Sequence, residues 1–428
     1  MSPHVKKGAG LEAMGVRARQ AGRQLSGISS SAKDRALLNI ADALDANHEN
    51  ILDANERDIL AGKKHGINDI LADRLVLNTE RLKGMADDVR SVAALSDPVG
   101  EVLETRELPN GLYISRKRVP LGVIGAIYES RPNVTVDIAV LCIKSGNSVL
   151  LRGGKEALHS NTILATIIRN QIATAGVPKD AVQFIESTDR SLVKQMLSMK
   201  DYIDLVIPRG GAALIHKVSR EAAMPAITGG VGVCHTYVDC DADINMAVSI
   251  TYNAKVSRPY VCNALDTILV HSSIAPVFLP TMAEKMSDHA VELRCDQRAF
   301  SILEHLDFPG KIVAAKEEDW GKEFLSLTAA VKTVDSLDEA LQHIQRYNSG
   351  HTEAIVTDNE SAAERFLNEV DSGVVMVNSS TRFNDGAQFG LGAEVGISTS
   401  KIHARGPMGL KELTSYKWTV IGTGQIRA

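Results

Sequence analysis

The sequence lacks any long apolar run. Its most apolar stretch, residues 134–143, is short and contains Asp137, whereas a helix that crosses a bilayer needs roughly 20 apolar residues. Residues 1–10 also lack the apolar core and cleavage site of a secretory signal. We therefore expect a soluble protein of the cytoplasm that has no membrane-spanning segment.

An excess of positive charge is also absent. The chain has 47 lysines and arginines against 52 aspartates and glutamates, which gives a net charge of -5. Proteins that bind nucleic acids usually concentrate basic charge on one face. The balance predicts no nucleic-acid partner.

The cysteines form no C-x-x-C pair and are odd in number, since the chain has five: Cys142, Cys234, Cys240, Cys262 and Cys295. Their scatter is typical of a reduced cytosolic protein and argues against both a disulfide framework and a zinc site. We expect no metal, and chemistry on one or two of these thiols at most.

A length of 428 residues suits two or three packed lobes. The first hundred residues have helical spacing of apolar side chains, and Ser31-x-x-Asp34 has the form of a capping box. The sequence contains no internal repeats.

Beyond Leu103, strand patterns alternate with helix patterns, which predicts a parallel, doubly wound sheet followed by a second α/β unit. The predicted strands of the two units cover residues 122–128, 148–151, 182–185, 204–208, 232–238, 266–271 and 353–357. Asn110-Gly111 is a hairpin signal, and residues 416–421 have the pattern of an edge strand. Together they would form an oligomerisation sheet.

Ligands of parallel sheets bind at the carboxyl ends of the strands, so the residues that follow each strand are the first candidates for ligand binding. Arg152 and Lys155 follow one strand, and basic residues at such a place favour NADP over NAD, unless the turn is merely solvated. Gly210 and Gly211 open a helix whose backbone N–H groups could bind a pyrophosphate, although glycine turns are common. The usual G-x-G-x-x-G fingerprint is missing.

Cys262 is the most informative cysteine. It follows Arg258-Pro and precedes a strand, on a loop or a helix start where a helix dipole or Arg258 could lower the thiol pKa. The alternative is an inert core thiol, and Cys295, which lies beside Arg294, stays open as a second candidate.

Several polar stretches place an arginine near the end of an apolar strand. Arg131 and Arg382 are the candidates taken from them. If these stretches are more than plain loops, such arginines suit a substrate that carries phosphate and carboxylate groups.

Four stretches resemble the aldehyde dehydrogenase superfamily, in particular its branch that reduces L-glutamyl 5-phosphate: VPLGVIGAIYESRPNVTVD (119–137), RPYVCNALDTILVH (258–271), SGHTEAIVTDN (349–359) and NSSTRFNDGAQFGLGAEVGISTSKIHARGPMGL (378–410). The resemblance runs from about Ser31 to the C-terminus. It implies an NADP(H)-binding domain (1–104 and 121–235), a catalytic domain (236–412), and an oligomerisation hairpin and strand (105–120 and 413–428).

The resemblance also implies roles for single residues. Cys262 would be the nucleophile, and Asn133 would stabilise the oxyanion together with the Cys262 N–H. Arg152 would replace the ribose-binding lysine of the superfamily, and Glu323 would hold the nicotinamide ribose. Arg131, Arg258 and Arg382 are interchangeable candidates for the substrate phosphate or carboxylate.

One departure from the wider superfamily bears on the reaction. Hydrolytic members carry a glutamate that activates water, whereas residues 226–231 here read AITGGV, without a carboxylate. A thioester would then outlive attack by water. The resemblance therefore implies NADPH-dependent reduction of the acyl phosphate in proline biosynthesis, by a homo-oligomer (dimer or tetramer) that could transiently contact glutamate 5-kinase. The rival hypotheses are another semialdehyde dehydrogenase, an acid-forming aldehyde dehydrogenase and a non-catalytic nucleotide-binding protein.

Overall fold

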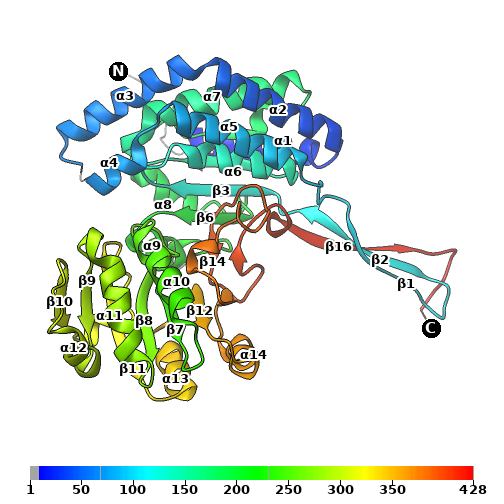
Figure 1. Ribbon diagram of the computed structural model, residues 1–428. Coiled ribbons are helices and arrows are strands. Elements are labelled where there is room, and N and C mark those ends of the chain that lie inside the picture. Colours follow the sequence, from blue (N-terminus) through cyan, green and yellow to red (C-terminus); the bar gives the residue numbers. More distant parts are fainter. Residues whose placement is uncertain (1–8, 68, 230, 428) are drawn as a thin grey trace. The chain divides into compact units, whose positions relative to one another are not determined.

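A computed structural model describes residues 9–67, 69–229 and 231–427, which form two compact units. The first unit contains the chain up to Gly229, Gly390–Gly396 and the chain from Pro407 onward. The second contains Gly230–Phe389 and Ile397–Gly406. Each unit is built around its own parallel sheet (Figure 1).

The sheet of the first unit has four parallel strands in the order β5-β4-β3-β6. Their bounds are β3 (Val123–Tyr128), β4 (Ser148–Arg152), β5 (Val182–Phe184) and β6 (Leu205–Arg209). The chain builds outward from β3 to β5 and then returns to the other side of β3. This reversal creates a switch point between β3 and β6, and ligands of such sheets bind at the carboxyl ends beside it.

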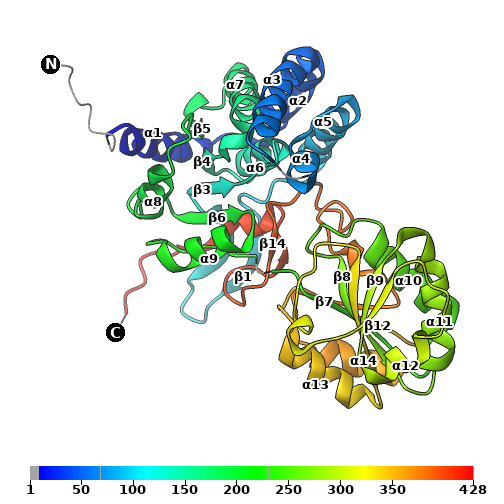
Figure 2. The same ribbon diagram turned by 90° about the vertical axis from the view of Figure 1, so that its left-hand side faces the viewer.

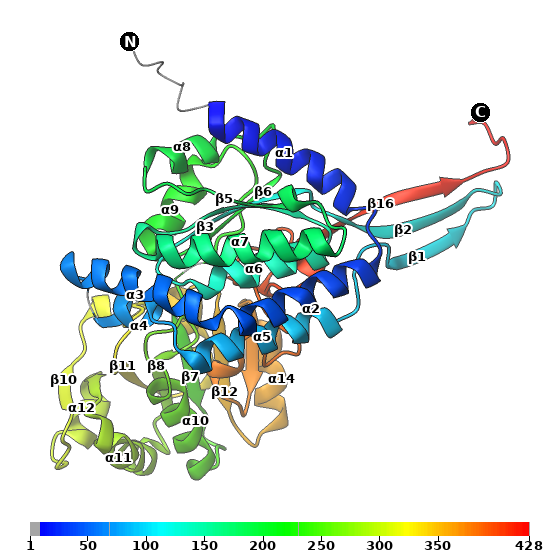
Figure 3. The same cartoon turned by 90° about the horizontal axis from the view of Figure 1, so that it is seen from above.

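Helices cover both faces of this sheet (Figures 2 and 3). Helices α6 and α7 lie on one face, α1 and α8 on the other, and α2, α3 and α5 pack outside α6 and α7. Because α6 is enclosed on both sides, almost all of its side chains are buried. The bounds are α1 (Ala9–Leu25), α2 (Ser30–Ala46), α3 (His48–Lys64), α4 (Asp69–Leu75), α5 (Thr79–Ala94), α6 (Asn133–Lys144), α7 (Leu158–Thr174), α8 (Ser191–Leu197) and α9 (Ala212–Glu221).

The start of α2 corrects one prediction. The capping residue is Ser29, whose hydroxyl accepts the N–H of Ala32, and Ser31 lies inside the helix. The capping box predicted for Ser31 and Asp34 is therefore wrong, because the cap lies two positions earlier and its third following residue, Ala32, has no side-chain acceptor. The helix itself is confirmed.

A small antiparallel sheet in the first unit joins distant parts of the chain. It has the order β1-β2-β16, with β1 (Val102–Glu107), β2 (Tyr113–Pro120) and β16 (Thr414–Ile421). Figure 3 shows the three strands side by side. The hairpin turn falls at Asn110-Gly111, as predicted, and Gly111 has a φ of +80°.

The second unit has seven parallel strands in the order β10-β9-β11-β8-β7-β12-β13. Helices α10, α11 and α12 pack on one face, and α13 and α14 on the other (Figure 2). On β7, Val238 packs with the first group and Tyr237 with the second, since successive strand residues face opposite ways. The bounds are β7 (Cys234–Val238), α10 (Ile244–Val256), β8 (Leu265–His271), α11 (Ala275–Met286), β9 (Glu292–Cys295), α12 (Gln297–Leu303), β10 (Lys311–Ala314), β11 (Thr328–Val334), α13 (Leu337–Tyr347), β12 (Thr352–Val356), α14 (Glu360–Glu369) and β13 (Val374–Val377). Two short strands, β14 (Ile397–Ser398) and β15 (Gly406–Pro407), pair with each other in a separate sheet.

The predicted fold class is thus confirmed: an α/β protein with two parallel sheets and a small antiparallel one. Among the residues that the structure describes, no helix is long and apolar enough to cross a membrane.

Candidate active site

Cys262 lies in the turn between α10 and β8 and is half-buried. Burial raises the pKa of the Cys142, Cys234 and Cys295 thiols, which lie in the core. Cys240 is exposed, but partial burial and then the charge of Asp239 raise its thiol pKa. Each of the other four thiols is therefore disfavoured as a thiolate, which leaves Cys262 as the candidate nucleophile.

An arginine and an asparagine surround this turn. Arg382 donates to the Asn263 side-chain oxygen and, at 3.3 Å, to the Ser257 hydroxyl. Burial and the positive charge of Arg258 lower the pKa of Arg382, while Asp385 and Cys262 oppose this shift. The second unit therefore brings two of the predicted arginines, Arg258 and Arg382, within electrostatic range of one another and places Arg382 within range of the cysteine.

The chain after β13 explains how Arg382 reaches Cys262. Asn378 still lies at the carboxyl end of β12. There its side-chain amide accepts a hydrogen bond from the Thr357 N–H and donates one to the Thr357 carbonyl. The chain then runs back along the sheet, so that Thr381 donates to the Asn263 carbonyl at 2.7 Å and Asn384 donates to Thr352 at 2.6 Å. Arg382 thus follows the carboxyl end of one strand but acts at the amino ends of its neighbours.

The start of β7 and the loop before it contact the main chain of Cys262. The Cys234 thiol donates to the Cys262 carbonyl at 3.2 Å, and a Cβ on Gly232 would lie 1.9 Å from that carbonyl oxygen. The Glu323 carboxylate accepts the Gly232 N–H at 3.1 Å. Gly232 therefore lies between the Glu323 carboxylate and the main chain of Cys262.

These positions correct one expectation. Strand carboxyl ends are the expected ligand edge of a parallel sheet, but the cysteine cluster lies at the amino edge of the second sheet. Cys262 precedes β8, Glu323 precedes β11, and Cys234 begins β7.

A buried ion pair supports the loop that carries Glu323, and sequence reasoning missed it. Lys255 lies 3.7 Å from Asp266 and donates to the Ser326 carbonyl at 3.1 Å. Asp266 accepts the Phe324 N–H at 3.0 Å, and burial raises its pKa to about 6 while Lys255 opposes the shift. The available signal was a charged residue inside an apolar helix and another at the start of an apolar strand.

In the first unit, the switch point carries Glu129 after β3 and Gly210-Gly211 after β6. The Glu129 carboxylate accepts the Gly211 N–H at 2.9 Å, and a Cβ on Gly210 would lie 2.4 Å from the same carboxylate. The start of α9 therefore binds an anion here, as helix N-termini do. The anion is a side chain that the sequence reading did not assign.

Arg152 ends β4 and is buried, whereas Lys155 is exposed. The Arg152 guanidinium donates to the Gly153 carbonyl at 2.8 Å, and its Nε has no hydrogen-bond partner among the described residues. Burial lowers the pKa of Arg152, and the negative charge of Glu156 opposes this. A buried cation with an unused donor fits the phosphate of a nucleotide cofactor.

Asn133 and Arg131 are also in the first unit, and both are half-buried. Asn133 begins α6, and its amide donates to the Asp137 carboxylate at 2.9 Å. Burial, with a further contribution from Asp88, raises the pKa of Asp137 to about 7. Asp137 thus orients the predicted oxyanion-binding amide, a role that the sequence did not reveal.

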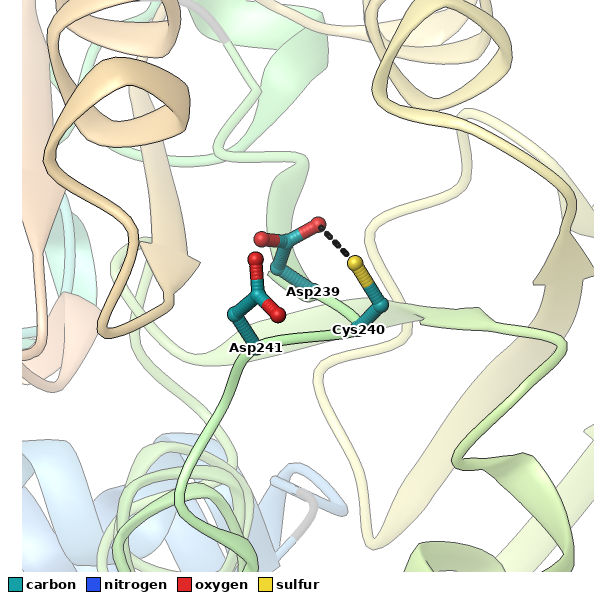
Figure 4. A group of neighbouring side chains, drawn as sticks. All are labelled: Asp239, Cys240 and Asp241. Atoms are coloured by element: carbon teal, nitrogen blue, oxygen red, sulfur yellow. Dashed lines mark hydrogen bonds between the residues drawn. The ribbon is translucent and has the colours of Figure 1, made fainter.

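The described residues contain one group that resembles a metal site, Asp239, Cys240 and Asp241, with ligand atoms within 4.8 Å of one another (Figure 4). Its oxygens already accept hydrogen bonds. Asp239 binds the hydroxyls of Tyr237 and Thr357 at 2.9 and 2.7 Å. The Asp239 carboxylate therefore joins the ends of β7 and β12 through these hydrogen bonds.

Two parallel α/β units, a cysteine in a turn of the second and a buried arginine in the first agree with the arrangement that the resemblance to the aldehyde dehydrogenase-type oxidoreductases implies. Residues 5–300 and 320–419 match the profile of the Aldehyde dehydrogenase family. The chain is 61% identical over 410 residues to a gamma-glutamyl phosphate reductase of Dehalococcoides mccartyi, covering 96% of both chains. It is 51% identical over 419 residues to that of Escherichia coli, covering 98% of this chain and 100% of the relative.

A solved structure agrees. The crystal structure of gamma-glutamyl phosphate reductase from Thermotoga maritima superposes with a TM-score of 0.93 at 45% identity, covering 98% of this chain and 100% of that one. The chain belongs to the aldehyde dehydrogenase family and, within it, to the gamma-glutamyl phosphate reductases.

Proposed function

We propose that this enzyme reduces L-glutamyl 5-phosphate to L-glutamate 5-semialdehyde and phosphate, through a thioester on Cys262, with NADPH as the reductant. This is the second step of proline biosynthesis from glutamate. The observation that carries the proposal is the half-buried cysteine with Arg382 within charge range. Relatives that bear the reductase name support the substrate.

The first chemical step joins the Cys262 sulfur to the acyl carbon and breaks the bond from that carbon to the phosphate oxygen. Arg382, Arg258 and Arg131 would bind the departing phosphate or the substrate carboxylate, because guanidinium groups bind both anions bidentately. Asn133 and the Cys262 N–H would stabilise the oxyanion, and losing one such donor typically costs about 10²–10³ in rate.

Arg152 and Lys155 would bind the 2′-phosphate, Gly210 and Gly211 the pyrophosphate, and Glu323 the nicotinamide ribose. For the pyrophosphate to use the Gly211 N–H, the Glu129 carboxylate must rotate away, since it now accepts that bond. When bound, NADPH supplies the hydride for the thioester carbon, and Cys262 then leaves as a thiolate to release the aldehyde.

Water is a poor rival to this chemistry. Thr228 lies in the stretch where hydrolytic relatives have their glutamate, and no carboxylate occurs in residues 226–231; Gly230 lies outside the described residues. Without that base, the thioester outlives attack by water.

We further assign cofactor binding to the first unit, catalysis to the second, and oligomerisation to the sheet of β1, β2 and β16. We place the enzyme in the cytoplasm as a dimer or tetramer that contacts glutamate 5-kinase transiently.

The test is the reverse reaction. The purified protein is mixed with glutamate 5-semialdehyde and NADP, and NADPH absorbance is followed with and without phosphate. Turnover that requires phosphate supports an acyl-phosphate reductase. Equal turnover without phosphate would identify an acid-forming aldehyde dehydrogenase instead, and no turnover in either arm would reject both.

A further inference from the structure

The first unit contains a pocket of about 580 Å³ at the amino edge of its sheet, the edge opposite to the predicted cofactor residues. Its lining includes residues at the end of α1 and at the base of β2 and β16. Its walls come from six stretches that are separate in the sequence: Arg19, Gly22, Arg23 and Ser26; Val99 and Gly100; Lys117–Pro120, Gly122 and Val123; Gly146; Asp204; and Lys417. The volume is typical of a site for a small molecule.

Five positive side chains and one carboxylate line this pocket. Arg19 is paired with Asp204 at 3.0 Å, and Arg118 is paired with Glu101 at 2.9 Å. Asp204 also accepts the Val123 N–H at 2.8 Å, so both of its carboxylate oxygens already accept hydrogen bonds from within the protein.

The other three cations, Arg23, Lys117 and Lys417, form no side-chain hydrogen bond or ion pair with any described residue. Two of them face each other, because Lys417 is directly opposite Lys117 in the antiparallel pairing of β16 with β2. Like charges at directly opposed positions destabilise a sheet. An anion between them would turn this repulsion into binding energy.

The remaining wall is apolar, formed by Val99, Val119, Pro120 and Val123. Main-chain donors at the floor are already used, since the Gly122 N–H donates to Asn147 at 2.8 Å. Recognition would therefore come from the three unpaired cations and from contact of a larger body with the apolar wall.

We propose that this pocket binds a phosphate ester of nucleotide size that carries at least two negative charges, at a site separate from catalysis. The ligand's phosphates lie among Arg23, Lys117 and Lys417, and its organic part lies against the valine and proline side chains. The site does not depend on the proposed reductase function, because none of its lining residues belongs to the catalytic or cofactor set.

The experiment titrates ATP and, separately, pyrophosphate into the full-length protein by calorimetry. The variant Arg23→Ala/Lys117→Ala/Lys417→Ala is compared with Lys64→Ala/Lys83→Ala/Lys200→Ala, which removes the same charge from exposed positions of the first unit. We expect wild type and the control to bind ATP at this site and the pocket variant to bind at least about tenfold more weakly. Pyrophosphate should bind at the same site more weakly than ATP, since it cannot reach the apolar wall.

Three results would overturn the proposal: no ATP binding to wild type at millimolar concentration, equal binding in the pocket variant, or an equal loss in the control. A thermal melt tests whether the pocket variant is folded. We expect that it is, because the substitutions remove repulsion between positive side chains. Its basal turnover should match wild type, so a failure of this site and a failure of the reductase assignment are measured separately.

Discussion

Glu323 accepts the main-chain N–H of Gly232 at 3.1 Å, and Gly232 lies against the carbonyl of Cys262. One residue therefore separates the predicted ribose-binding carboxylate from the main chain of the nucleophile. A side chain at Gly232 should displace Cys262 directly, because an added Cβ would meet its carbonyl oxygen at 1.9 Å and its Cβ at 2.7 Å.

The substitution Gly232→Ala should lower kcat about a hundredfold, because a displacement of roughly 1 Å at a reacting group costs that much. The new Cβ would lie 1.9 Å from the Cys262 carbonyl oxygen, so the main chain must move. The control is Gly84→Ala in α5, where nothing lies within 4 Å of the added carbon. It should keep full activity, and a Gly232→Ala enzyme with wild-type kcat would contradict this geometry.

Cys262→Ser should reduce turnover by at least about a thousandfold and leave NADPH binding unchanged, since the thiol is the proposed nucleophile. Turnover is measured by NADPH oxidation and binding by nucleotide fluorescence. Cys240→Ser is the matched control, because Cys240 is exposed and its thiol is disfavoured as a thiolate. Near-normal turnover of Cys262→Ser would reject the thioester mechanism.

Arg152→Ala should weaken NADPH about tenfold more than NADH, because it removes a buried cation with an unused donor from the proposed 2′-phosphate site. Dissociation constants for both nucleotides provide the measurement. Lys155→Ala, at the exposed end of the same turn, should have a smaller effect. Equal losses for the two nucleotides would show that Arg152 does not distinguish them.

The acid sensitivity of the second unit should depend on His343. Its ring packs against Trp320, Tyr347 and His235, with centroids 5.4, 4.6 and 5.6 Å away. Burial, followed by the charges of His235, Lys332 and Arg346, lowers its pKa to about 3. Since the unfolded chain binds this proton near pH 6.5, stability is present above that pH and is lost as the pH falls toward 3.

His343→Phe keeps the aromatic contacts and removes the proton site. Between pH 7 and 5, the free energy of unfolding of the wild type, measured in urea, should fall by up to about 2 kcal/mol. The variant should retain this stability. His305→Gln, at a side chain that is 87% exposed, should leave the pH dependence of the unfolding free energy the same as in wild type. If the unfolding free energy of wild type and His343→Phe depends on pH in the same way, His343 is not a source of the acid sensitivity.

Local patterns predicted many of the elements but not all of them, since β9, β10 and β11 of the second sheet were not among the predicted strands. The strand at β4 and the hairpin at Asn110-Gly111 were both predicted, since apolar runs and turn residues act within a few positions. The cap of α2 was misplaced because Ser29, Ser30 and Ser31 share the same capping chemistry. Only the packed helix distinguishes among them.

The site was predicted residue by residue but not as an arrangement. Cys262 and Arg382 were both chosen, yet their proximity depends on a chain that runs back along the sheet after β13, and no local pattern records that path. The pairs Glu129–Gly211 and Lys255–Asp266 were missed for the same reason. Each joins positions that are neighbours only after the sheet forms.

The pairing of β2 with β16 also sets an order of events during synthesis. Lys417 lies opposite Lys117, 300 residues later in the chain. While the ribosome makes the intervening segment, β2 has only β1 as a neighbour, and a two-stranded hairpin is marginal in water. The unpaired edge of β2 is then open to strands of other nascent chains. Its basic residues, Arg116, Lys117 and Arg118, repel identical edges and so protect the growing chain until β16 emerges.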